Sequence, residues 1–168
     1  RVALSYPGGI VVLDGASLDA LGDLTSEQFT RLNSAGDGRH IMVTTSEGFQ
    51  VLDAGTSDVE PELTDLVFPA AKPGHVVTHG GKTVLYADGT SDSTVFDSDA
   101  LLASTDSLPS VETIPGVEAH HGVSIVLEDG TFLTTVGNAD GRNGVIAKDA
   151  SGATVSQSSD CPGVHGEG

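Results

Sequence analysis

Histidine recurs along this chain at nearly constant intervals, and imidazole is a common ligand of zinc and other transition metals. His75, the pair His120 and His121, and His165 are separated by 46 residues (His75 to His121) and 44 residues (His121 to His165). Each site follows a turn that contains Pro or Gly and precedes an extended segment. In a fold that brings these positions together, three neutral imidazoles with a carboxylate or water would form the four-coordinate site that zinc favours.

An internal repeat of short strands indicates a fold of this kind. Runs of β-branched and apolar residues end at Asp14, Asp53, Asp97 and Asp149, in steps of 39, 44 and 52 residues. Each Asp precedes a small residue, as expected where its side chain caps a turn after a strand. Repeats of about 40–50 residues are typical of a β-propeller with one blade per repeat, in which equivalent positions of successive blades meet around a central channel.

We therefore predict an all-β fold, a β-propeller of four-stranded blades, with residues 1–168 as a single portion of it. This portion holds about 3.5 blades. The predicted ranges are a partial blade at 1–28, full blades at 29–74, 75–119 and 120–163, and the start of a fifth at 164–168. We expect the chain to be part of a larger ring of about 7–8 blades, completed by another segment or chain, because an open propeller exposes strand edges.

In this register the histidine sites begin the innermost strands of the third, fourth and fifth blades, at one mouth of the channel. Neighbouring residues on a strand point to opposite faces, so only one of His120 and His121 can face the channel. The other would support a ligand by a hydrogen bond or lie between blades. Glu167 would point the same way as His165, either as a fourth ligand or as the group that orients a histidine.

Two further histidines are expected to lie away from this site. His79 is four residues beyond His75, about 13 Å along a strand. His40 begins a second strand, one layer out from the channel, and is expected to be structural. A structural role is the alternative for every histidine of the repeat. In β-propellers a histidine at this point often forms hydrogen bonds between neighbouring blades and has no other function.

The composition argues against several classes of protein. A net charge of −17, with only 7 Lys and Arg, disfavours binding to nucleic acid or to anionic lipid. No apolar run reaches the roughly 18–20 residues of a transmembrane helix. The chain begins with Arg1 and shows no signal peptide, so we expect a processed or trimmed product. An acidic surface suits solubility and also raises the local concentration of cations.

Catalytic motifs are absent from the sequence. It contains no G-x-S-x-G elbow and no Walker spacing. A propeller hydrolase that uses a metal as Lewis acid usually needs several carboxylates at strand starts, and only Glu118 and Glu167 lie near them. We therefore expect a protein that is not an enzyme.

Three segments, Gly74–Thr90, His120–Val123 and Asp160–Glu167, resemble the AztD-type zinc metallochaperones, the last two most specifically. The first 70 residues match only as generic propeller blades. The resemblance implies a periplasmic or extracellular, secreted β-propeller that binds Zn²⁺ and delivers it to the solute-binding protein of an ABC zinc importer. It also implies an interior zinc site built largely from histidines, which maps onto His75, His120 or His121, and His165.

The same resemblance implies a disulfide between Cys161, the single cysteine here, and a cysteine of the following blade. It is also the reason to prefer zinc, since imidazole suits copper and nickel as well. The expected function is thus zinc binding and delivery. The alternative is a β-propeller interaction scaffold with structural histidines and no physiological metal.

Overall fold

The computed structural model describes residues 1–104, 106–164 and 166. Within this part the chain forms fifteen strands and one short 3-10 helix, η1 (Ser98–Ala103), which confirms the predicted all-β fold. Every strand pairing is antiparallel. No helix in the described residues has the length and apolar character needed to cross a membrane.

The strands form four sheets that follow one another along the chain, the first with three strands and the others with four. The first two sheets contain β1 (Val2–Tyr6), β2 (Gly9–Leu13), β3 (Ala20–Thr25), β4 (Leu32–Ser34), β5 (His40–Thr44), β6 (Gly48–Asp53) and β7 (Glu62–Pro69). The last two contain β8 (Pro73–His79), β9 (Lys82–Ala87), β10 (Ser93–Asp97), β11 (Glu112–Ile114), β12 (Ser124–Val126), β13 (Phe132–Gly137), β14 (Arg142–Lys148) and β15 (Thr154–Ser158).

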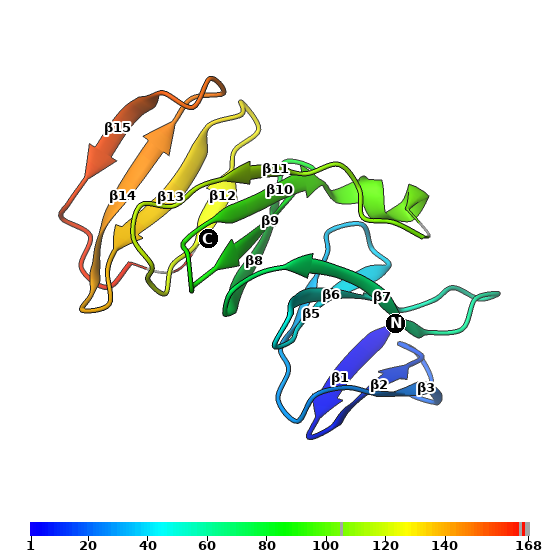
Figure 1. Ribbon diagram of the computed structural model, residues 1–168. Coiled ribbons are helices and arrows are strands. Elements are labelled where there is room, and N and C mark those ends of the chain that lie inside the picture. Colours follow the sequence, from blue (N-terminus) through cyan, green and yellow to red (C-terminus); the bar gives the residue numbers. More distant parts are fainter. Residues whose placement is uncertain (105, 165, 167–168) are drawn as a thin grey trace.

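Successive sheets pack against one another through their first strands. Strand β8 packs against β4 and β5 of the preceding sheet, and β12 packs against β8 and β9. Figure 1 shows the four sheets following one another around an arc. Four-stranded antiparallel sheets arranged in this way are the blades of a β-propeller, so the predicted fold class is confirmed.

The sheets span residues 2–25, 32–69, 73–114 and 124–158. The third sheet begins at Pro73, before the blade boundary placed between residues 74 and 75 from the sequence. In the three-stranded first sheet, β1 and β2 have the places in the repeat that β5 and β6 have in the second. Of the segment 164–168, Val164 and Gly166 are described and belong to no strand, and the other residues lie outside the described part.

The recurrent aspartates cap turns, as the sequence predicts, at three of the four positions. Asp14, Asp53 and Asp149 each accept a hydrogen bond from the backbone amide two residues on, at 2.9, 2.8 and 2.9 Å. Asp97 differs, because its carboxylate pairs with the Lys82 ammonium across the hairpin at 2.6 Å.

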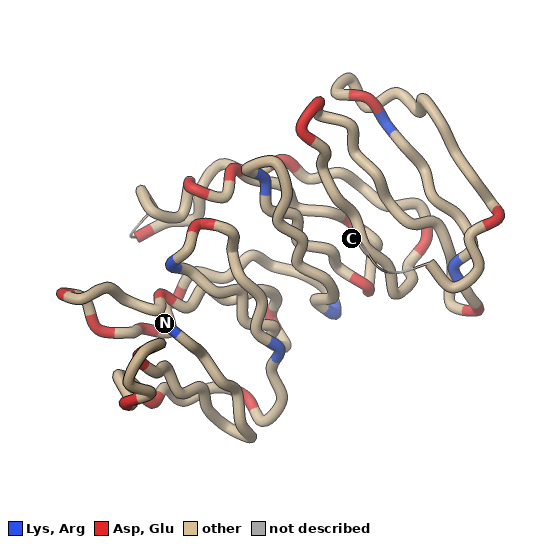
Figure 2. Tube along the Cα trace, turned by 180° about the vertical axis from the view of Figure 1, so that it is seen from behind, with Lys and Arg blue, Asp and Glu red and all other residues tan. Residues whose placement is uncertain are grey.

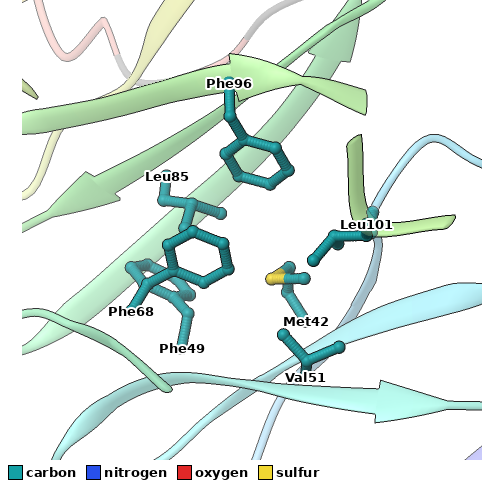
Figure 3. Packing of buried hydrophobic residues seen from close by; sticks show 8 residues of the cluster. Met42, Phe49, Val51, Phe68, Leu85, Phe96 and Leu101 are labelled. Atoms are coloured by element: carbon teal, nitrogen blue, oxygen red, sulfur yellow. The ribbon is translucent and has the colours of Figure 1, made fainter. Parts of the chain in front are cut away.

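Apolar side chains fill the space between the second and third sheets (Figure 3). The Phe68 and Phe96 rings stack with centroids 4.9 Å apart. Helix η1 adds Leu101, which is fully buried in this cluster. Sequence analysis did not predict this helix, because hydrophobic periodicity needs a window of about 11–18 residues and η1 is much shorter.

The junctions between sheets differ in chemistry. Between the first and second sheets the contact is apolar, with Ile10 and Val12 of β2 against Val43 and Leu52. Between the third and fourth sheets buried polar groups meet, and Ser93 donates a hydrogen bond to Ser124 at 2.9 Å. The predicted histidine site lies beside this polar junction.

Candidate metal centre

His75 occupies an irregular position in β8. Pro73 pairs with Ala87 and Val76 pairs with Leu85, so Gly74 and His75 together lie opposite the single residue Tyr86. This is a β-bulge, which bends a strand and re-aims a side chain. The half-buried His75 ring thereby lies close to the His121 ring of the segment that precedes β12.

His121 is held by a carboxylate from the third sheet. Its Nδ1 lies 2.7 Å from Oδ2 of Asp88, in the turn that follows β9. A carboxylate only accepts hydrogen bonds, so Nδ1 carries the proton and, in the neutral ring, the lone pair is on Nε2. The side chain of His121 is 39% exposed, which leaves it accessible from solvent.

His75 and His121 have the separation of two ligands of one metal ion. Their ring centroids are 5.1 Å apart and their planes are tilted by 40°. With Zn–N distances of about 2.0–2.1 Å and tetrahedral angles, two imidazoles on one zinc have centroids about 5 Å apart. The buried Oδ1 of Asp88 has no hydrogen-bond partner among the described residues, which suits a nearby cation. The spacing of the two imidazoles therefore fits zinc.

His120 has different surroundings, although it is adjacent in sequence. It is buried, and its Nδ1 lies 2.9 Å from Ser91 Oγ and 2.8 Å from the Glu118 carbonyl oxygen. Its Nε2 lies 2.9 Å from Thr135 Oγ1 and 3.0 Å from the Tyr86 hydroxyl. Both ring nitrogens thus form hydrogen bonds between the third and fourth sheets. A position between blades is one of the two that the sequence predicted for the histidine of the pair that does not face the channel.

The structure describes only some of the predicted site residues. His165 and Glu167 lie outside the described residues. In residues 1–104, 106–164 and 166 no group of three His, Cys, Asp or Glu side chains lies close enough to hold a metal ion. The described part therefore brings His75 and His121 together, with the Asp88 carboxylate hydrogen-bonded to the His121 ring.

The remaining two histidines have hydrogen-bond partners other than His75, His121 and Asp88. His79 is exposed at the end of β8, with Nδ1 3.2 Å from the Val126 carbonyl oxygen. His40 is buried at the start of β5, with Nδ1 2.5 Å from Asp37 Oδ2. This contact within one sheet agrees with a structural role for His40.

The pair of Asp37 and His40 predicts a loss of stability in acid. Burial raises the pKa of Asp37, but hydrogen bonds from the His40 ring and from the backbone amides of His40 and Arg39 outweigh it, and the pKa falls below 3.8. The ionised carboxylate therefore stabilises the fold above about pH 4, and this stabilisation is lost as the pH falls through the folded pKa. We expect the urea midpoint to drop between pH 5.5 and pH 3, and to drop less in Asp37→Asn.

Asp58→Asn is the matched control for this prediction, because Asp58 lies on an exposed loop. It should show the same pH dependence as the wild type. An Asp37→Asn protein whose midpoint falls as far as that of the wild type would contradict the role assigned to Asp37.

Cys161, the single cysteine of the sequence, follows the last sheet and is partly buried. Its backbone amide donates to the Asn143 carbonyl oxygen at 2.9 Å, which fixes this segment beside the start of β14. The disulfide with a cysteine of a following blade stays a prediction.

Sequence reasoning did not predict that Asp88 lies beside His121. Asp88 precedes Gly89 directly after a strand, a pattern that reads as a turn. Its nearness to His121 depends on the packing of one sheet against the next, since the two residues belong to different repeats. One signal could have predicted this contact. In antiparallel strands, the turn after a blade's second strand, where Asp88 lies, is at the same end of the blade as the start of the first strand, which His121 precedes in the next blade.

Four antiparallel sheets in succession form a portion of a β-propeller, and the packing of the fourth sheet on the third brings the His75 and His121 rings together. The chain is similar in sequence to a protein named zinc chaperone AztD, from Citrobacter koseri (strain ATCC BAA-895 / CDC 4225-83 / SGSC4696). The two are 28% identical over 134 residues, 75% of this chain and 31% of that protein. No protein-family model matches the chain.

The fold is also that of solved AztD structures. Apo AztD from Citrobacter koseri matches 97% of this chain and 47% of its own with a TM-score of 0.78 and 23% identity. A second crystal structure of Citrobacter koseri AztD covers 96% of this chain and 46% of its own, with a TM-score of 0.77 and 23% identity. The chain thus spans less than half the length of these relatives.

Proposed function

We propose that this protein is a zinc-binding metallochaperone that delivers zinc to the solute-binding protein of an ABC zinc importer, and that it is not an enzyme. The observation that carries the proposal is the pair of His75 and His121, with ring centroids 5.1 Å apart. The relation to a protein named a zinc chaperone supports the choice of zinc over other metals that imidazole binds.

Zinc is the cargo of this protein. His75 and His121 each supply one imidazole nitrogen, and His165 supplies a third. Water or Glu167 completes the four-coordinate site. Because the His121 side chain is 39% exposed, a recipient can approach this ligand and exchange it for one of its own.

The proposed setting is the periplasm or the cell exterior, where the solute-binding protein of an importer operates. The remaining blades of the ring come from another segment or another chain. Figure 2 shows Asp and Glu spread over all four sheets and their loops, with few Lys or Arg between them. Such a surface concentrates cations near the site and suits a partner with a basic docking face.

The test is zinc transfer measured in the presence of a chelator that captures free zinc. The purified protein is loaded with one equivalent of zinc and mixed with the importer's solute-binding protein, and zinc on each is followed by native mass spectrometry. We expect the recipient to gain zinc faster than the chelator removes it from the loaded protein alone. Transfer no faster than release to the chelator would contradict direct delivery.

A second function, an interaction scaffold without physiological metal, is favoured by one specific observation. His120 and His40 are both buried and hydrogen-bonded, so two of the six histidines already have structural roles. Under this function zinc would bind weakly and without fixed stoichiometry. Histidine substitutions would then lower stability and leave zinc affinity unchanged.

A further inference from the structure

We propose that Asp88 is a positioning residue that fixes the tautomer and the orientation of His121, so that Nε2 of His121 faces the metal. The inference rests on the proposed function, because it assigns the residue that prepares one zinc ligand. Asp88 lies in the turn after β9 of the third sheet, and His121 lies in the segment that precedes β12 of the fourth. The contact therefore ties the ligand to the neighbouring blade.

A hydrogen bond joins the two side chains. Oδ2 of Asp88 lies 2.7 Å from Nδ1 of His121, and the carboxylate can only accept. Nδ1 of His121 must therefore be protonated, which leaves Nε2 as the metal-binding nitrogen of the neutral ring. Carboxylates that accept from the second nitrogen of a metal-bound histidine fix its ring and raise its basicity.

The chain holds Asp88 in place through its backbone. The amides of Asp88 and Gly89 donate to the carbonyl oxygens of Lys72 and Ala71 at 2.9 and 2.8 Å. These bonds join the turn after β9 to the residues just before β8. The turn that carries the carboxylate and the strand that carries His75 are thus one connected unit.

Gly74 makes room for the carboxylate. A Cβ at this position would lie 2.3 Å from Oδ1 of Asp88, too close for the two atoms to coexist. Gly74 directly precedes His75, so the Asp88 side chain lies between the backbone of the His75 segment and the ring of His121. One carboxylate therefore touches both segments that supply the pair.

Oδ1 of Asp88 is buried and has no hydrogen-bond partner among the described residues. A buried acceptor left in this state is unfavourable unless positive charge lies nearby. A zinc ion on Nε2 of His121 would supply that charge through the imidazole. A direct Asp88–zinc bond is the competing arrangement, and the zinc affinity of Asp88→Asn separates the two.

The first measurement is the tautomer of His121 in the metal-free protein, read from the nitrogen chemical shifts of the ring by NMR. We expect protonated Nδ1 in the wild type and in Asp88→Asn, whose amide oxygen still accepts a hydrogen bond. In Asp88→Ala the ring should change to the tautomer with the proton on Nε2, which neutral histidine prefers in water. A His121 ring that keeps the proton on Nδ1 in Asp88→Ala would overturn the proposal.

The second measurement is zinc affinity by competition with a chelator. Asp88→Ala should weaken binding by about 10- to 100-fold, the usual effect of losing a residue that supports a metal ligand. Asp88→Asn should recover most of that loss. If Asp88→Asn binds zinc as weakly as Asp88→Ala while its tautomer is unchanged, Asp88 is a direct ligand and the positioning role is wrong.

Two further variants make the test independent of the Asp88 substitutions. Gly74→Ala displaces the carboxylate without removing it, and should weaken zinc binding in the same direction as Asp88→Ala. Asp140→Ala removes the same charge from an exposed turn of the fourth sheet and should bind zinc like the wild type. A wild-type protein that binds no zinc would overturn the proposed function, whereas the metal-free tautomer would still decide the role of Asp88.

Discussion

Replacing His121 with alanine should raise the zinc dissociation constant by more than the roughly 10- to 100-fold that loss of a supporting residue costs. The substitution removes one of the two imidazoles whose centroids lie 5.1 Å apart. Because the His121 side chain is 39% exposed, its loss should alter the fold little. The affinity is measured by competition with a chromophoric chelator, and urea unfolding verifies that stability is retained.

His79→Ala is the matched control for this prediction, since His79 is exposed at the far end of the strand that carries His75. It should bind zinc like the wild type. His40→Ala should also leave affinity almost unchanged, but it removes the partner of the buried Asp37 carboxylate and lowers stability. A His121→Ala protein that is folded and binds zinc as tightly as the His79→Ala control would exclude His121 from the site.

The sequence predicted the fold well because its signals are local. A β-propeller repeats one hairpin meander, and each copy carries its own alternation and its own turn residues, such as Asp14 and Asp53. The periodic spacing of the histidines then followed from the repeat itself. Helix η1 was not predicted, because it contacts the core through a single leucine, Leu101, and one apolar residue forms no periodic pattern.

The site was only partly predictable, for a physical reason. The sequence indicated that His120 and His121 point to opposite faces of a strand, but it did not indicate which of them is buried between the blades. That choice depends on contacts between blades, where Tyr86, Ser91 and Thr135 surround His120. The same kind of contact brings Asp88 to His121. Contacts between residues of neighbouring blades cannot be predicted from the residue spacing within one repeat.

Replacing His120 with alanine should lower the free energy of unfolding by about 2–4 kcal/mol, through a lost buried hydrogen-bond network and a cavity. The Tyr86 hydroxyl would lose its hydrogen bond with Nε2 of His120, 3.0 Å away. Thr135 and Ser91 would keep bonds to the Val123 amide and the Glu118 carbonyl oxygen. The measurement is urea unfolding of the metal-free protein.

Close packing around the ring argues that His120 acts on stability and not on zinc. A Cβ at Gly122 would lie 2.2 Å from Thr135 Oγ1, 2.6 Å from His120 Nε2 and 2.6 Å from the Tyr86 hydroxyl oxygen, which leaves no space for a metal ion on that nitrogen. Folded His120→Ala should therefore bind zinc within about threefold of the wild type, whereas His121→Ala should not. Tyr86→Phe, which removes only the hydroxyl, should cost about 1 kcal/mol. A His120→Ala protein of normal stability that has lost zinc binding would reverse the roles of the two neighbouring histidines.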